Sequence, residues 1–384
     1  MNHQPTETGR WEHAARGHLP RAVWLALAAA AVIAGGALAG DVFGGALGPD
    51  GQELVVGPAE EAGGGQVSPQ ATAETPERAP AGTGTTQGLA HRHVWSLAEG
   101  RDGRLWAGTS QGLSWFDGDS WRTDRREDGP GYSRVVSLAI GDDGSVWAAT
   151  EGSRGVLRFH GGDWTAYTTA DGLADNAVSS VAIADDGTVW ANTPESLARF
   201  TGRRWVRGAP GGGGLGDAVI SWVAATGDSS LWAEVPAGLA RWRDGKLRTY
   251  TAADGLASAS VGAVAVAEDG TVWVATRRGL SRRRDGEWTT FTTDDGLAGD
   301  SVTSVALADD GTVWAATLDG LSRGRDGEWM TFTTHDGLAG DAVTSVAVAD
   351  DGTVWAGTHD GLSRFQNDSW TSYTGRGSLP GGQG

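Results

Sequence analysis

The stretch Asp309 to Trp329 reads DDGTVWAATLDGLSRGRDGEW, and close copies of it lie on both sides. It holds two tryptophans, five carboxylates and four glycines. Aromatic rings next to carboxylates occur in sugar-binding and acid/base sites, but a repeated scaffold can also need them. The spacing of the copies distinguishes these possibilities.

One tryptophan recurs every 41 to 43 residues, at Trp106, Trp147, Trp190, Trp232, Trp273, Trp314 and Trp355. Each unit divides into four short runs rich in Val, Thr and aromatic residues, such as VTSVALA, TVWAAT, GLSRG and EWMTFT, and Asp-Gly pairs separate several of them. Short β-prone runs between Asp-Gly pairs are typical of hairpins. Seven such units predict an all-β fold, a seven-bladed β-propeller of four-stranded antiparallel blades. We expect blade 7 to pack on blade 1 without an exchanged strand, with the segment QGLAHRH as the linker at this junction.

The repeated tryptophans and aspartates are expected to be structural. Alternation along a strand places Trp314 and Ala316 on one face and Val313 and Ala315 on the other, so a large ring would pack against small residues between blades. A second tryptophan opens the outer strand of six units, and Leu247 replaces it in the fourth. Acidic pairs such as Asp309 and Asp310 are interpreted as hairpin turns, because no set spaced like a calcium loop is present.

Residues 22–40 read AVWLALAAAAVIAGGALAG, a run of 19 residues without a charge. As a helix the run would span about 28 Å, close to the hydrocarbon thickness of a bilayer. Arginines precede it and carboxylates follow it, which predicts a single-pass membrane anchor with residues 1–21 in the cytoplasm and the rest outside. The alternative is a signal peptide cleaved after Ala39, which would make the protein secreted.

The propeller is expected to occupy residues 88–374. Residues 41–87 are rich in Gly, Pro, Ala, Thr and Glu and predict a disordered linker, and residues 375–384 predict a disordered tail. The net charge of -18 excludes a nucleic-acid backbone as a natural partner, because phosphates require a basic surface. The chain has no cysteine, which excludes disulfides, thiolate catalysis and cysteine-bound metals, and no motif indicates a cofactor.

The units, with cores such as TVWAGTHDGLSRF and linkers such as DGLAGDAVTSV, resemble the two-component regulator propeller repeat from Gly88 to about Thr374. The resemblance implies an extracytoplasmic ligand-sensing propeller of a membrane regulator, often followed by a histidine kinase. The sequence ends soon after the seventh unit, so we expect a separate signalling partner in the membrane. The repeat is also similar, less closely, to the propeller of streptogramin-inactivating lyases, which use a histidine and acidic residues with a divalent metal. The histidines of this propeller are scattered over its first, second, sixth and seventh units and fix no such site.

Positions that differ between copies are the best candidates for a ligand site, because loops carry function on rigid scaffolds. The loops between second and third strands vary most and share one face with the linkers between blades. We expect this face to bind a small molecule, carbohydrate or protein through five residues that contribute charge and hydrogen bonds. They are Arg277, Arg278, Glu151, Arg154 and His359.

Two off-pattern aromatic residues form a second set of candidates. Trp95 stands where the sixth unit has Thr303, and Trp222 is aligned with Val346 of the seventh. In an innermost strand near the channel, an exposed ring would stack on a sugar, whereas a buried ring would only fill volume. Three functions stay open: a sensor-type ligand-binding module, an enzyme of the lyase or hydrolase type, and a protein-interaction scaffold.

Overall fold

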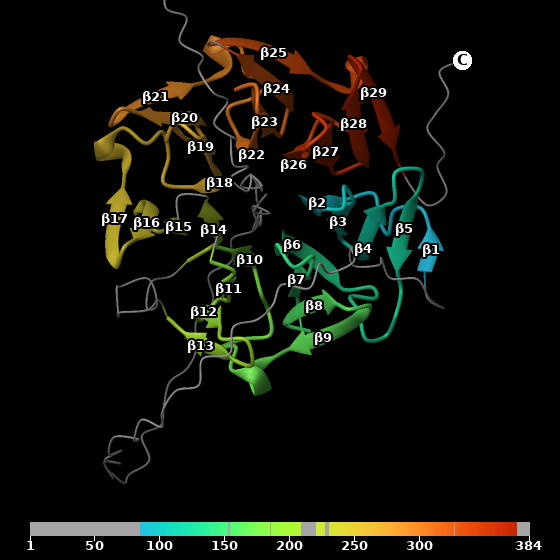
Figure 1. The fold of residues 1–384 in the computed structure, drawn as a ribbon. Helices are drawn as coiled ribbons and strands as arrows, with labels where there is room; N and C mark the ends of the chain where they lie inside the picture. Colours follow the sequence, from blue (N-terminus) through green and yellow to red (C-terminus); the bar gives the residue numbers. More distant parts are fainter. Residues whose placement is uncertain are drawn as a thin grey trace, which may run out of the picture.

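The structure, a computed structural model, describes residues 85–374 apart from 153, 185, 209–219, 227–229 and 326. The described chain forms a ring of seven blades around a central axis, and we call the innermost strands and the ends of their loops the channel side (Figure 1). Each blade is an antiparallel sheet whose four repeat strands run in chain order from the channel side outward. The seven-bladed propeller is therefore confirmed. The expected cytoplasmic segment, anchor and tail, and nearly all of the expected linker, lie outside the described residues.

Blades 1 and 2 contain β2 (Val94–Glu99), β3 (Leu105–Thr109), β4 (Gly112–Phe116) and β5 (Trp121–Asp124), then β6 (Arg134–Ile140), β7 (Val146–Glu151), β8 (Val156–His160) and β9 (Asp163–Tyr167). Blades 3 and 4 contain β10 (Ser180–Ile183), β11 (Val189–Asn192), β12 (Leu197–Phe200) and β13 (Trp205–Arg207), then β14 (Val223–Thr226), β15 (Ser230–Val235), β16 (Gly238–Arg243) and β17 (Lys246–Tyr250). Blades 5 and 6 contain β18 (Val261–Val266), β19 (Val272–Thr276), β20 (Gly279–Arg284) and β21 (Glu287–Phe291), then β22 (Val302–Leu307), β23 (Val313–Thr317), β24 (Gly320–Arg325) and β25 (Glu328–Phe332). Blade 7 contains β26 (Val343–Val348), β27 (Val354–Thr358), β28 (Leu362–Gln366) and β29 (Ser369–Tyr373).

Blade 1 has a fifth strand that the repeat does not predict. The strand β1 (Thr85–Gln87) pairs antiparallel with β5 on the outer edge of the blade, with Thr86 opposite Thr123. These three residues were expected to end the linker. The described chain thus enters the propeller as an added edge strand and then crosses blade 1 toward the channel side.

The repeated tryptophans pack between blades, as expected. Trp314 and Ala316 belong to one hydrophobic cluster with Val354 and Ala356 of blade 7, while Val313 and Ala315 belong to a cluster with residues of blade 5. Tyrosine or phenylalanine rings of the outer strands pack against these tryptophans. The ring centroids of Phe332 and Trp314, for example, lie 5.8 Å apart. Each blade thus buries one large ring against the small and branched residues of the next.

The linkers before blades 3, 5, 6 and 7 contain one turn of 3-10 helix: η1 (Thr169–Asp171), η2 (Ala252–Asp254), η3 (Thr293–Asp295) and η4 (Thr334–Asp336). In the last of these, Thr333 Oγ1 accepts from the His335 backbone and Asp336 accepts from the backbone N–H of Thr333 at 2.8 Å. This reciprocal pair is a capping box. The turn ends at Gly337 with φ 111°, a conformation that favours glycine. The repeated TxxDGL pattern is therefore linker chemistry.

Blade 7 closes the ring on blade 1 without an exchanged strand, which confirms the expected closure. The two blades share one hydrophobic cluster that includes Leu97, Phe116, Trp355 and Tyr373. Gly88-Leu89-Ala90 packs on blade 1 as the other linkers pack on the blades that follow them. The Gly88 carbonyl accepts from Thr123 and the Ala90 N–H donates to Ser114, just as Gly337 and Ala339 bond to Ser372 and Ser363.

Candidate functional site

The most concentrated departure from the repeat lies where blades 7, 1 and 2 meet on the channel side. The His93 ring stacks on the Trp95 ring, with ring centroids 4.1 Å apart. The centroid of the His359 ring lies 4.2 Å from that of His93. The Arg134 guanidinium lies 5.3 Å from the centre of the Trp95 ring and pairs with Glu151 at 2.5 Å. We call these five residues, His93, Trp95, Arg134, Glu151 and His359, the seam cluster.

Trp95 is placed on the channel side by a β-bulge. The register of β2 and β3 shifts between Val94 and Ser96, so Trp95 stands outside the ladder. Blades 6 and 7 have the same shift with threonine at this position, which confirms the alignment of Trp95 with Thr303. There Thr303 donates to the Val343 carbonyl of the next blade at 2.7 Å. Trp95 is half-buried instead, and its Nε1 donates to Ser110 of the loop after β3 at 2.9 Å.

The His93 imidazole lies close to that of His359 and is neutral near pH 7. Burial lowers the pKa of His93 to about 4, and the positive charges of His359, His91 and Arg134 act in the same direction. His91 Nδ1 accepts from the His93 backbone at 3.0 Å. His93 Nε2 is buried and has no hydrogen-bond partner among the described residues. A ligand with a hydrogen-bonding group would satisfy this nitrogen.

The residues predicted for this face are only partly brought together. Trp95, Glu151 and His359 belong to the seam cluster. Arg154 lies at its edge, where it donates to the Glu127 carbonyl in the linker between blades 1 and 2. Arg277 and Arg278 are exposed in the loop between β19 and β20 of blade 5, on a different part of the ring (Figure 1).

Trp222 is a packing residue. It is 3% exposed, and its Nε1 donates to the Val261 carbonyl of blade 5 at 2.5 Å. The expected alignment with Val346 is wrong by one residue, because Val223 pairs with Ala233 as Val346 pairs with Ala356. Trp222 therefore stands level with Ser345.

Glu234 lies beside Trp222, and the charge of Arg277 acts on the Glu234 carboxyl. Its Oε1 accepts from the Val261 N–H at 3.0 Å. Burial raises the pKa of Glu234, while hydrogen bonds from Val261, Ser221 and Ser260 and the charge of Arg277 oppose this shift. These contacts join blade 4 to blade 5 and form a structural unit.

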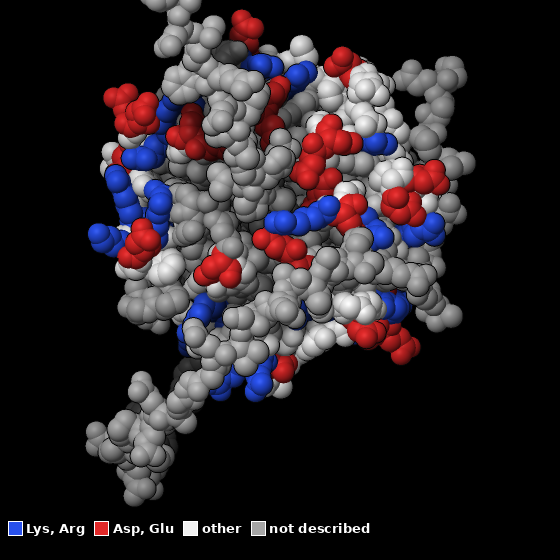
Figure 2. Space-filling model, in the orientation of Figure 1, with Lys and Arg blue, Asp and Glu red and all other residues white. Residues whose placement is uncertain are grey.

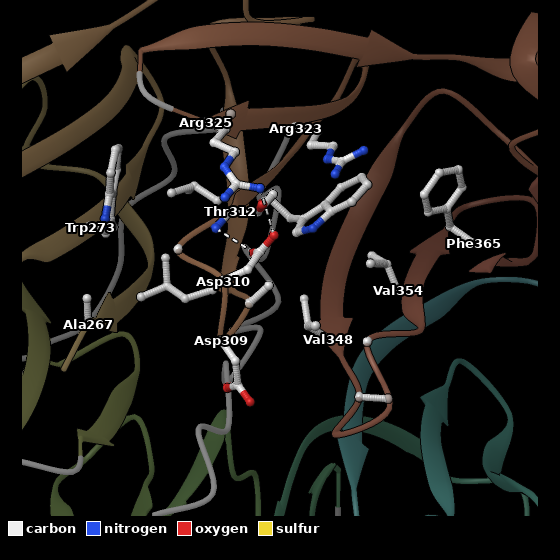
Figure 3. Close-up of a pocket in the computed structure, with 18 of the residues that line it drawn as sticks. Ala267, Trp273, Asp309, Asp310, Thr312, Arg323, Arg325, Val348, Val354 and Phe365 are labelled. Carbon is white, nitrogen blue, oxygen red and sulfur yellow. Dashed lines mark hydrogen bonds and ion pairs between the residues drawn. The ribbon is translucent and has the colours of Figure 1, made fainter. Parts of the chain in front are cut away.

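The opposite face carries a groove of about 1150 Å³ along the Asp-Gly turns of blades 5 to 7 (Figure 3). Asp310 accepts from the Thr312 N–H at 2.9 Å and from Arg325 at 3.1 Å, and Trp273 and Phe365 flank the groove. Asp269 and Asp351 accept from Thr271 and Thr353 in the same way. Hydrogen bonds from Thr312 and the Arg325 charge keep the pKa of Asp310 low. These aspartates are turn residues, as expected, and the groove is a product of the repeat.

Several residues of the candidate site were missed from the sequence. His93 was missed because it and the predicted His359 belong to the first and last units, which only the closed ring makes neighbours. Arg134 begins β6 directly after a linker that reads RREDGPGYS where the linkers before blades 3, 5, 6 and 7 read DGLA, and this difference was a usable signal. In that linker Tyr132 is 68% exposed, and the Arg125 guanidinium lies 4.3 Å from its ring centre.

A family model described as "Two component regulator propeller" matches residues 88–111, which include His91, His93, Trp95 and the first repeated tryptophan. The same pattern recurs in all seven blades. The chain carries the two component regulator propeller repeat. No curated protein sequence matches it significantly.

Several solved structures share this fold. One is an extracellular domain from B. thetaiotaomicron, BT3049, named as part of a hybrid two component system, with TM-score 0.56 and 16% identity over 73% of this chain and 46% of that one. A second is the extracellular domain of BT4673, named as part of a one component system, with TM-score 0.57 and 18% identity over 74% and 40%. This chain thus spans less than half the length of those two domains. A third is virginiamycin B lyase from Staphylococcus aureus, with TM-score 0.56 and 15% identity over 72% and 96%.

Within residues 85–374 and apart from the gaps given above, no helix is long and apolar enough to cross a membrane. Among the same residues, no group of three or more histidines and carboxylates is arranged to hold a metal ion.

Proposed function

We propose that this chain is a sensor-type ligand-binding propeller, held outside the cytoplasm by residues 22–40 and acting through a separate signalling partner. The ligand site is the seam cluster. The observation that carries the proposal is that three blades each replace repeat residues with functional side chains at one point on the channel side. His93 and Trp95 come from blade 1, Arg134 and Glu151 from blade 2, and His359 from blade 7.

The chemistry of the seam cluster fits a small polar ligand or a carbohydrate. Indole and imidazole rings provide flat surfaces for stacking, and Arg134 and Glu151 provide charge-assisted hydrogen bonds. The Trp95 ring already contacts His93 and Arg134. A stacking ligand must therefore displace one of these side chains or use the remaining part of the ring.

The expected location and output rest on the sequence outside the described residues and on the repeat. The charge pattern around residues 22–40 supports an anchored propeller outside the cytoplasm. The similar domains of BT3049 and BT4673 are named as extracellular parts of signalling systems. These points support a sensor whose output lies in another chain.

An enzyme is the second candidate, because the lyase from Staphylococcus aureus shares the fold and three histidines approach one another here. Lyase chemistry of that kind would need a carboxylate and a metal beside a histidine. Asp360 lies next to His359, but its carboxylate is 3.7 Å from Arg92 and is half or more exposed. The geometry therefore favours binding over catalysis.

A thermal-shift screen of the full chain with small molecules and carbohydrates would identify ligands. Each hit is then measured with Trp95→Thr and His359→Leu, which install the residues that blade 6 carries at these positions, Thr303 and Leu318. We expect affinity to fall at least 10-fold in both variants. The matched control is Arg278→Asp, which installs the equivalent of Asp319 elsewhere on the same face.

Equal affinity in all variants would disprove the seam cluster as the site. A loss confined to Arg278→Asp would move the site to blade 5, as the sequence also suggested. A pull-down from membranes with the full chain tests the signalling partner separately, and recovery of no membrane regulator would count against that part of the proposal.

A further inference from the structure

Blades 3 and 4 carry a basic outer edge. Their outer hairpins, residues 197–208 and 238–250, contain eight arginines and lysines and one carboxylate. The equivalent hairpins of blades 5 to 7, residues 279–291, 320–332 and 361–373, contain six basic residues and five carboxylates. In a chain with a net charge of -18, this local reversal sets blades 3 and 4 apart. We call these two hairpins the basic rim.

The basic rim points to solvent. Arg203, Arg204, Lys246 and Arg248 are exposed, and no carboxylate of the described residues lies within ion-pair distance of them. In Figure 2 basic side chains gather over β17, whereas acidic and basic groups are mixed over the rest of this view. The rim is therefore available to an anionic partner.

Exposed apolar side chains accompany these cations. Val206 on β13 is 37% exposed, and Leu247 on β17 is 41% exposed. Leu247 takes the place of the tryptophan that opens the outer strand in the other six blades. A soluble polyanion would neutralise the cations but would not bind the apolar side chains of Val206 and Leu247. A lipid surface uses both, because anionic headgroups attract Lys and Arg while small apolar groups enter the interface.

We propose that the basic rim docks on an anionic lipid surface, so that the disc stands on its edge at the membrane. The inference rests on the membrane anchor of the proposed function. The expected linker permits this orientation, since more than 40 residues reach about 140 Å when extended. The strand β1, where the described chain begins, lies across the ring from blade 4 (Figure 1). Both faces of the disc, including the seam cluster, stay open to ligand in this orientation.

The absence of cysteine allows one labelled position at a time. Thr249→Cys on β17 and Thr331→Cys on β25 are matched sites, because both residues are exposed at the same position of an outer strand. The full chain carrying an environment-sensitive dye at either site is mixed with vesicles of phosphatidylcholine, with or without phosphatidylglycerol. We expect the dye at position 249, but not at 331, to shift to the blue with the anionic vesicles only. High salt should reverse the shift.

The double variant Lys246→Glu with Arg248→Glu should lower the dye response at position 249 at least 10-fold, with an unchanged melting temperature. A response to neutral and anionic vesicles alike, or at both labelled positions, would overturn the proposal. A response to inorganic polyphosphate without one to vesicles would also overturn it and indicate a soluble polyanion. Flotation of the chain with neutral vesicles tests the anchor alone, so failure of the anchor and failure of the rim are distinguishable.

Discussion

Glu99 Oε2 accepts a hydrogen bond from the Asp350 N–H at 3.1 Å, across the junction where blade 7 meets blade 1. The other blades carry an apolar residue at the position of Glu99, such as Leu307 and Val348. Burial raises the pKa of Glu99 to about 7, and the charges of Asp350, Asp351 and Asp102 act in the same direction. The carboxyl therefore makes the ring closure sensitive to pH.

The sign of this sensitivity follows from proton linkage. Between the unfolded pKa of about 4.5 and the folded value of about 7, the folded state binds more protons than the unfolded state, so stability falls as pH rises. Glu99→Gln should remove this slope and stabilise the chain by about 1–3 kcal/mol at pH 8. Chemical denaturation at pH 5 and pH 8 checks this. The same slope in both proteins would show that other groups cause it.

Loss of an interblade ring should cost far more than loss of an exposed outer residue. Trp314→Ala is expected to lower the free energy of unfolding by about 3–5 kcal/mol, because the ring is 3% exposed between blades 6 and 7. Leu247→Ala, in the blade that lacks the outer tryptophan, should cost below about 1 kcal/mol. Denaturant titration of both variants gives the comparison. Similar losses would contradict the structural role of the repeated tryptophan.

The threonines at the bulge position allow a test of the closure itself. Thr344 donates to the Val94 carbonyl across the closure, and Thr303 donates to Val343 inside the ring. Thr344→Val and Thr303→Val should each cost about 1–3 kcal/mol, since each leaves a buried carbonyl with one partner fewer. Thermal unfolding of the two variants measures the difference. A negligible loss in Thr344→Val alone would mean that blade 7 is not firmly docked on blade 1.

The predicted anchor can be tested independently of any ligand. The full chain should stay in the membrane fraction after an alkaline carbonate wash, and a variant without residues 22–40 should not. The mass of the protein from membranes distinguishes an uncleaved anchor from cleavage after Ala39. Recovery of the full chain in the soluble fraction would contradict the anchor.

Most of the fold could be predicted from the sequence because the same local pattern repeats seven times. The period, the alternation around Trp314 and the turn role of Asp310 are local properties, and all three are confirmed. The strand β1 was missed because Thr85–Gln87 aligns with the linker segment Thr293–Asp295, which forms a 3-10 turn and not a strand. The alignment of Trp222 with Val346 was wrong although the spacing defines it, since Val223 precedes Trp232 by nine residues, just as Val346 precedes Trp355.

The candidate site was harder to predict from the sequence because it depends on distances between units. His359 and Trp95 could be selected as off-pattern residues, but their proximity follows only from the closed ring. Arg134 was missed because it begins the inner strand β6 and so lies outside the variable loops. The separation of Arg277 from the seam cluster likewise follows from the position of blade 5 in the ring.

The closure of blade 7 on blade 1 also sets an order in time. His93 and Trp95 leave the ribosome early, whereas His359 is synthesised near the end of the propeller. The seam cluster therefore cannot assemble during synthesis of the first six blades, however well they fold. Ligand binding at the seam cluster would therefore require that blade 7 has been synthesised and has packed on blade 1.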